Sequence, residues 1–182
     1  MIAYQCSNVS VSVVDKDQNR IHAWKYHSPP FREPGLIDIL AAIQERIRES
    51  VAQNGTQLDA FGAGKGFSLD MANVQNVART IAQVATGYKI IVEKSTIPCG
   101  TSDMLRDLLH TSSTSHARFE VLSNPEFLSE GTAISNLLNP SRVLIGCQQN
   151  PPGQAAADAL ATLYRAWIPP SAILILLRQH AG

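Results

Sequence analysis

Short apolar runs alternate along this chain with longer stretches in which apolar residues recur every three or four positions. The runs are rich in β-branched residues and predict buried strands, whereas the longer stretches have the period of amphipathic helices. Because the expected strands are apolar on both faces, they predict an α/β fold with a mostly parallel sheet that helices cover on both sides. We expect strands over 9–15, 89–93, 119–122, 142–146 and 172–177. Helices are expected over 36–51, between 70 and 87, and over 153–167. Shorter helices are expected around Trp24 and Leu105.

The composition favours small-molecule chemistry in one ordinary domain. The 182 residues include 15 basic and 15 acidic side chains, and a net charge of zero argues against binding nucleic acid or anionic lipid through bulk charge. The cysteines show no CxxC pairing, the first residues do not resemble a signal peptide, and no apolar run approaches the roughly 20 residues that span a bilayer. We therefore expect a soluble cytoplasmic protein without nucleic-acid or membrane partners.

The first expected strand ends at Asp15. In dinucleotide-binding βαβ units, the acid that accepts the ribose hydroxyls ends the second strand, roughly 20 residues after a GxGxxG turn. Counting back from Asp15 by that distance passes the first residue, so the glycine turn and the strand before it are not among these residues. Arg20 can reach the same ribose or a phosphate. Both residues also have a plain structural interpretation, as an acid after a strand and a solvated cation on a helix.

Two other features attract attention but do not support a site. The run AFGAGKG at 60–66 resembles a phosphate-binding loop, yet Asp59 stands where its first glycine belongs and Gly66 where its hydroxyl belongs. We interpret it as a surface loop. Cys99 has no histidine neighbour in the sequence and is interpreted as a packing residue. The five histidines lack the spacing of metal ligands, so no metal site is expected.

Two further strand ends carry polar residues suited to catalysis. Ligands bind open parallel sheets at the carboxyl ends of the strands, so residues 94–96 and 124–126 are expected to converge on one crevice. There Thr96 can orient a water molecule and Glu126 can act as a general base. Glu130, four residues after Glu126, shares a face with it if the segment is helical. Alternatively, the proline of 124–126 merely ends the strand and the glutamate caps a helix.

Longer motifs resemble one known family. The run VLSNPEFLSEGTAI at 121–134 is continued by NPSRVLIG at 139–146, and VVD, EPGL, GKG and VEKSTIP precede them in the matching order. Over most of residues 9–174 the sequence is similar to the UDP-glucose/GDP-mannose dehydrogenase family, and within it to the members that oxidise UDP-glucose. The resemblance implies a Rossmann-like NAD-binding domain that lacks its first strand and glycine turn.

By this resemblance, the protein is an oxidoreductase that converts the C6 alcohol of UDP-glucose to the acid of UDP-glucuronate, with two hydride transfers to NAD+. The resemblance also implies the role of each matching residue. Asp15 and Arg20 would hold the adenosine ribose, Ser95, Thr96 and Ile97 would line the cofactor, and Thr96 would also position the catalytic water. Glu126 matches the acid/base glutamate; Glu126, Phe127, Leu128, Ser129 and Glu130 match the stretch that contacts the sugar nucleotide, and Glu130 also touches NAD.

Departures from the family limit what these residues are expected to do alone. Residues 44–58 resemble nothing in it, and its Asn-Thr-Pro-Thr cofactor motif, its central helix and its C-terminal UDP-binding domain are not found among the 182 residues. The segment with the nucleophilic cysteine is not found either, and taking an aldehyde to an acid needs a covalent thiohemiacetal or its equivalent. We therefore interpret 1–182 as a partial NAD-binding N-terminal domain, inactive on UDP-glucose by itself.

Two alternatives remain open from the sequence. One is a non-catalytic remnant of such an enzyme, which binds nucleotide or full-length subunits. The other is a GDP-mannose dehydrogenase. Family members assemble largely through segments that follow the matched region, so the sequence leaves open whether this chain takes part in a homo-oligomer.

Overall fold

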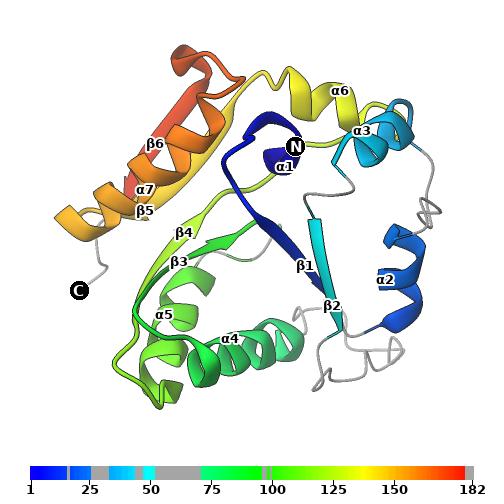
Figure 1. Cartoon of the computed structure of the whole chain (residues 1–182). Helices are drawn as coiled ribbons and strands as arrows, with labels where there is room; N and C mark the ends of the chain where they lie inside the picture. The colour runs from blue at the N-terminus through cyan, green and yellow to red at the C-terminus, as the bar shows by residue number, and fades with distance from the viewer. Residues whose placement is uncertain are drawn as a thin grey trace, which may run out of the picture. The chain divides into compact units, whose positions relative to one another are not determined.

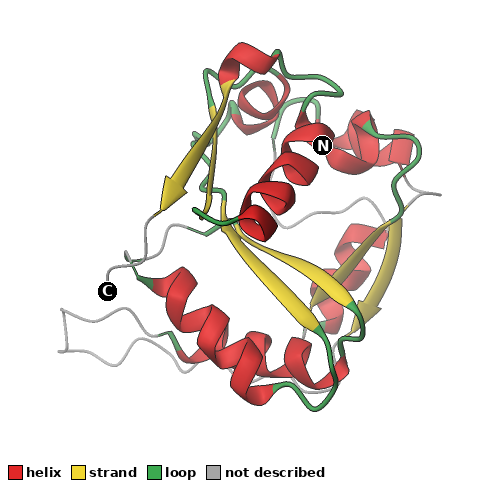
Figure 2. Ribbon diagram, turned by 90° about the vertical axis from the view of Figure 1, so that its left-hand side faces the viewer, coloured by secondary structure: helices red, strands yellow, loops and turns green. Residues whose placement is uncertain are grey.

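The computed structural model describes residues 1–15, 17–25, 33–43, 47–51, 71–95, 98 and 100–178 (Figure 1). The chain divides into two compact units, the first made of 1–55, 126–145 and 158–175 and the second of 56–125, 146–157 and 176–182. Helices and strands alternate along the chain, and the fold is α/β, as the sequence predicts (Figure 2).

The first unit contains two parallel strands. It begins with α1 (Ile2–Gln5), β1 (Val11–Asp15), α2 (Gln18–Lys25), α3 (Leu36–Ile43) and β2 (Ile47–Val51). The pairing of β1 with β2 runs from Val11 opposite Ile47 to Asp15 opposite Val51. Parallel strands need a crossover connection, which α2 and α3 provide here. The strand expected over 9–15 is therefore confirmed, with Asp15 at its carboxyl end.

The helix expected over 36–51 is wrong in its second half, because α3 ends at Ile43 and residues 47–51 form β2. Ile43, Ile47 and Val51 are spaced four residues apart. Residues at this spacing share a face of a strand, whose period is two, and nearly share a face of a helix, whose period is 3.6. Pairing with β1 decides between the two, since it gives the backbone groups of β2 their hydrogen-bond partners. The pairing of β1 with β2, and not the local pattern, therefore determines that residues 47–51 form a strand.

The apolar face of α3 forms the core of the first unit. Its buried positions recur at helical spacing and pack against α1, β1 and α6 (Ala133–Leu138), a helix that the sequence did not predict. The position of α3 thus links the start of the chain to the segment that follows residue 130. The buried cluster consists of Ala3, Leu36, Ile39, Leu40 and Ile43, with Met1, Val11 and Ile134 partly buried against it.

The second unit repeats the parallel arrangement. It contains α4 (Ala72–Val84), β3 (Tyr88–Glu93), α5 (Thr101–Ser112) and β4 (Arg118–Ser123). The pairing of β3 with β4 is parallel, from Tyr88 opposite Arg118 to Glu93 opposite Ser123. The N-cap of α4 is Met71, and the residue before it, Asp70, lies outside the described residues. Gly87 adopts a φ of 69° in the turn from α4 to β3, a left-handed conformation that favours glycine.

Helices α4 and α5 contribute to one apolar core with β3 and β4. Phe119 and Val121 of β4 are almost fully buried, and Leu109 of α5 has no exposed surface. The core holds the carboxyl ends of β3 and β4 side by side. The buried cluster consists of Ala78, Ala82, Ala85, Leu105, Leu109, Ala117, Phe119 and Val121, with Val74, Ile81, Ile91, Met104 and Leu108 partly buried against it.

The last part of the chain completes a mostly parallel sheet. Its elements are β5 (Val143–Gln148), α7 (Pro151–Tyr164), the short 3-10 helix η2 (Pro170–Ala172) and β6 (Ile173–Arg178). The strand order among the described residues is β3-β4-β5-β6, and β5 meets β4 in an antiparallel contact at Ser123 and Gly146. These elements confirm the expected strands over 142–146 and 172–177, each to within two residues.

Candidate functional site

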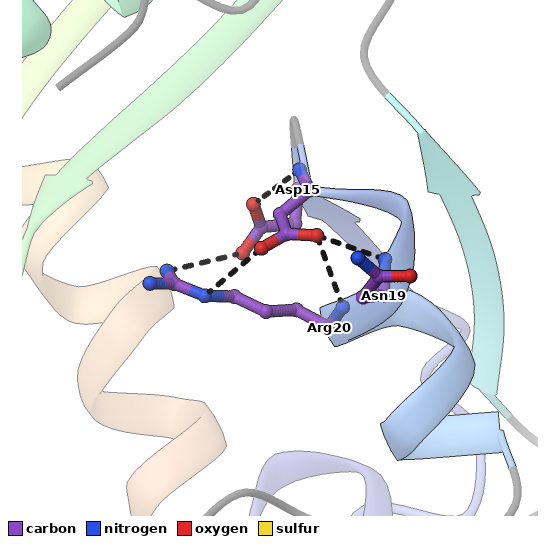
Figure 3. A network of polar contacts seen from close by, with 4 residues as sticks. Asp15, Asn19 and Arg20 are labelled. Carbon is purple, nitrogen blue, oxygen red and sulfur yellow. Dashed lines mark hydrogen bonds and ion pairs between the residues drawn. The ribbon is translucent and has the colours of Figure 1, made fainter.

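Asp15 and Arg20 lie together where β1 passes into α2 (Figure 3). Nη1 of Arg20 is 3.9 Å from Oδ2 of Asp15, and the two side chains are 56% and 31% exposed. Oδ1 of Asp15 accepts a 2.9 Å hydrogen bond from the backbone N–H of Asp17. A long, solvent-exposed ion pair of this kind adds little stability. The carboxylate is therefore held in place mainly by the backbone and stays partly open to solvent.

Asp17 orients the guanidinium, although the sequence analysis did not single it out. Its Oδ1 accepts hydrogen bonds from the backbone N–H groups of Asn19, at 2.8 Å, and Arg20, at 3.4 Å, and so caps the first turn of α2. Its Oδ2 lies 3.7 Å from Nε of Arg20, which keeps the long side chain beside Asp15 (Figure 3). An aspartate directly before an expected helix is a cap signal, so this residue could have been found from the sequence.

This end of β1 suits the adenosine ribose of NAD. A carboxylate can accept hydrogen bonds from two neighbouring hydroxyls, and within the described ranges Oδ2 of Asp15 has only the distant guanidinium as a partner. The pyrophosphate of a dinucleotide needs a helix N-terminus, and that of α2 is already occupied by the carboxylate of Asp17. The carboxylate of Asp15 could therefore hold the ribose hydroxyls, whereas the start of α2 does not offer a cradle for the pyrophosphate.

Hydrogen bonds tie the carboxyl ends of β3 and β4 together. The backbone N–H of Asn124 donates to the carbonyl of Glu93 at 2.8 Å, and Nζ of Lys94 donates to Oδ1 of Asn124 at 3.3 Å. Asn124 is only 1% exposed, so its side-chain amide is a buried polar group that needs such partners. Ser95, which is exposed, donates its backbone N–H to the Glu93 carboxylate. These hydrogen bonds thus fix the backbone at the points where the segments after β3 and β4 begin.

Glu93 is only 9% exposed, and the Oε1 atom of its carboxyl group has no hydrogen-bond partner among the described residues. Burial raises the pKa of this carboxyl, against weaker opposing effects of the Ser95 N–H and the Lys94 charge. The folded chain therefore binds this proton more tightly than the unfolded chain does. Its contribution to stability is greatest at low pH and is lost as the pH rises from the ordinary value of 4.5 through the raised pKa.

Glu93→Gln removes this titration. We expect the free energy of unfolding of the variant, relative to the parent, to increase as the pH rises above 4.5, because only the parent acquires a buried charge when this carboxyl ionises. Urea denaturation at a series of pH values measures the difference. Asp107→Asn, which changes an exposed carboxyl on α5, should show no comparable trend. A difference between the Glu93 variant and the parent that does not change with pH contradicts the prediction.

Residues 126–130 have no regular secondary structure, and all five side chains are exposed. The backbone turns at Glu130 and Gly131, where φ is 80°, before α6 begins. The sequence analysis placed Glu126 and Glu130 on one face only if this segment is helical, and that condition is not met. Pro125 favours an extended backbone at the start of this stretch, because a residue that precedes a proline rarely adopts the helical conformation.

Arg142 lies against this segment. Its Cζ is 5.0 Å from the centroid of the Phe127 ring, a cation–π contact, and Phe127 remains 52% exposed. The sequence analysis treated Arg142 only as the start of a strand. No local pattern indicates the contact, because the two residues are brought together by the path of the chain between β4 and β5.

The structure brings together only part of the expected crevice. Asp15, Arg20 and residues 126–130 belong to the first unit, and Ser95 belongs to the second. Thr96 and Ile97 lie outside the described residues, as do Cys99 and the loop at 60–66. The expected meeting of Thr96 with Glu126 therefore stays a prediction.

Cys6 and Cys147 are buried free thiols, and Sγ of Cys6 donates to the carbonyl of Leu163 at 3.6 Å. In the part of the chain that the structure describes, no three His, Cys, Asp or Glu side chains gather as a metal site. None of the helices described is long and apolar enough to cross a membrane.

Residues 1–168 match the model of the UDP-glucose/GDP-mannose dehydrogenase family, NAD binding domain. The chain belongs to the UDP-glucose/GDP-mannose dehydrogenase family. The matched range includes Asp15 and Arg20, residues 94–98 and the whole of 126–130. The resemblance inferred from the motifs is therefore confirmed at the level of the family and its NAD-binding domain.

Curated members of this dehydrogenase family are similar along nearly the whole chain. UDP-glucose 6-dehydrogenase from Mus musculus is 39% identical over 96% of the chain, and the enzyme of that name from Caenorhabditis elegans is 38% identical over 96%. These alignments cover 38% and 40% of the two relatives. The chain thus spans about two fifths of the length of the curated relatives that it matches.

Solved structures of the dehydrogenase family share the fold. A UDP-glucose dehydrogenase from Pyrobaculum islandicum superposes with a TM-score of 0.78 at 22% identity, over 97% of this chain and 42% of that one. A GDP-mannose dehydrogenase from Pseudomonas aeruginosa superposes with a TM-score of 0.75, also at 22% identity, over 98% of this chain and 43% of that one. At these identities the likeness establishes a Rossmann-like fold.

Proposed function

We propose that the chain is a partial NAD-binding N-terminal domain of a UDP-glucose 6-dehydrogenase, which oxidises UDP-glucose to UDP-glucuronate with two NAD+. The observation that carries the proposal is the carboxylate of Asp15 at the end of a parallel strand, with the Arg20 guanidinium 3.9 Å away. The similarity to curated UDP-glucose 6-dehydrogenases, 39% identity in the case of the mouse enzyme, supports the choice of substrate.

In this proposal, different segments of the chain bind the cofactor and act on the substrate. Asp15 would accept the hydroxyls of the adenosine ribose, and Arg20 would add a positive charge beside them. Ser95, Thr96 and Ile97 would line the cofactor, and Thr96 would orient the water that attacks the oxidised carbon. Glu126, whose side chain is exposed, would take the proton of the alcohol or of that water as a general base.

Bound NAD+ would supply the hydride acceptor. Residues 126–130 present five exposed side chains to solvent and would contact the sugar nucleotide, with Glu130 also reaching the cofactor. A reducing compartment such as the cytosol is part of the proposal, because the cysteines of the sequence show no CxxC pairing.

Ligand-dependent stabilisation of the 182-residue polypeptide tests the substrate assignment. A ligand that binds only the folded state raises its melting temperature, and the rise at a given ligand concentration is larger for the ligand that binds more tightly. We expect NAD+ and UDP-glucose each to raise it, and UDP-glucose to do so more than GDP-mannose at the same concentration. A larger shift with GDP-mannose would move the assignment to the other branch of the family, and no shift with either sugar nucleotide contradicts the proposal.

An alternative of a different class is a remnant that binds nucleotide, or full-length subunits, without catalysis. The 182 residues contain no cysteine in the context that the second oxidation requires, so we expect the purified polypeptide to bind NAD+ without turning UDP-glucose over to UDP-glucuronate. The absorbance of NADH and the amount of UDP-glucuronate formed test this expectation. Turnover by this polypeptide alone contradicts the expectation of inactivity and supports catalysis without that cysteine.

A further inference from the structure

Glu33 holds the end of the segment 126–130 through both oxygens of its carboxylate. Oε1 accepts a 2.8 Å hydrogen bond from the backbone N–H of Gly131, and Oε2 accepts a 3.3 Å hydrogen bond from that of Ala133. Glu33 is the first residue of the EPGL motif, which lies about a hundred residues earlier in the chain. Two backbone donors in a turn are thus satisfied by one distant side chain.

The neighbouring backbone makes this contact specific. Gly35 follows Glu33 in a left-handed conformation with a φ of 80°, and a Cβ at that position would lie 3.7 Å from Cγ2 of Ile134. Ile134 also packs against the buried face of α3. The turn before α3 and the turn before α6 therefore lie against each other within the first unit. The Glu33 carboxylate joins them through its two hydrogen bonds.

Residues 125–129 form no helix or strand, so no regular ladder of backbone hydrogen bonds fixes this stretch. Phe127 contacts Arg142, and the carbonyl of Ser129 accepts hydrogen bonds from the backbone and hydroxyl of Thr132. Side-chain contacts have a larger share in fixing an irregular segment than in fixing a helix or strand, so removing a strong one is expected to loosen it.

We propose that Glu33 is a positioning residue that sets the conformation of residues 126–130 for the sugar nucleotide. This role rests on the proposed function of that segment. Glu33 itself need not touch the ligand; it acts through Gly131 and Ala133, which follow directly on Glu130. A carboxylate is required because both of its oxygens accept, whereas the amide of glutamine would direct an N–H donor at one of the two backbone N–H groups.

Hydrogen exchange on the ligand-free chain tests the positioning directly. We expect Glu33→Gln to raise the exchange rates of the amides of residues 129–133 by about tenfold or more, because hydrogen bonds to a charged acceptor are lost. Amides in the second unit, such as those of β3 and β4, should be unaffected. Glu33→Asp, which keeps the charge but shortens the side chain, should give an intermediate increase. Asp158→Asn, on the exposed face of α7, is the matched control and should change none of them.

Ligand titrations test the consequence. We expect Glu33→Gln to weaken the binding of UDP-glucose by about tenfold while the dissociation constant of NAD+ stays close to that of the parent. Unchanged exchange at 129–133 in the variant overturns the proposal. So does equal binding of UDP-glucose by variant and parent. A parent that does not bind UDP-glucose refutes the proposed function instead, and the exchange rates then still decide whether Glu33 orders the segment.

Discussion

Replacing Leu109 by alanine is expected to lower the free energy of unfolding by about 3 kcal/mol, the largest effect on stability that we predict. Leu109 lies on α5 with no exposed surface, in the buried cluster of the second unit beside Phe119 and Ala82. The truncation removes apolar contacts and leaves a cavity that the close-packed surroundings fill only in part. The same core holds the carboxyl ends of β3 and β4 in register.

Urea denaturation followed by circular dichroism measures this loss. Val84→Ala on α4 is the control, because Val84 is 74% exposed and its truncation should change the free energy of unfolding by less than about 0.5 kcal/mol. A loss at Leu109 as small as that at Val84 contradicts the packing described for this core.

Asp15→Asn is expected to weaken NAD+ binding by about tenfold to a hundredfold, since hydrogen bonds to a charged acceptor contribute about 1.5–3 kcal/mol. Asparagine has one acceptor oxygen, and that oxygen can replace Oδ1 of Asp15 as the acceptor for the Asp17 N–H. The amide would then offer a donor where the ribose hydroxyls need an acceptor. The local backbone is preserved, so the loss reports on the ligand.

Isothermal titration of the purified polypeptide with NAD+ measures this affinity. Asp38→Asn is the control, because Asp38 is an exposed carboxylate on α3 in the same unit and should leave the affinity unchanged. Equal affinities for the Asp15 variant and the parent would place the ribose away from β1 and remove the main physical support for the proposed cofactor site.

Much of the fold could be predicted because hydrophobic spacing is a local property. The five expected strands all form, since each is a continuous or alternating apolar run between turn residues. Residues 47–51 are one exception and show why the pattern alone is ambiguous, since apolar residues at intervals of four suit a helix and a strand alike. Pairing with β1 decided the outcome, and the sequence does not specify which strand lies next to which.

The candidate site was predictable to a smaller extent. Asp15 stands out because an acid at the end of a strand is recognisable from the local sequence. Asp17 is recognisable in the same way, as an aspartate directly before a helix. The contacts of Glu33 and Arg142 with 126–134 join residues that are distant in sequence, and nothing in the local pattern of either partner indicates them. These side chains become recognisable only once the chain path between the strands is known.

An NMR titration of the isotope-labelled polypeptide with NAD+ tests most directly whether this chain holds the cofactor at β1. The expected result is that the largest chemical-shift changes fall on Asp15, Asp17 and Arg20, with further changes at Ser95 and Glu130, and that they saturate together. Shifts confined to the helical surface of α4 and α5, or no saturable shifts at all, would contradict the assignment of an NAD site to these residues.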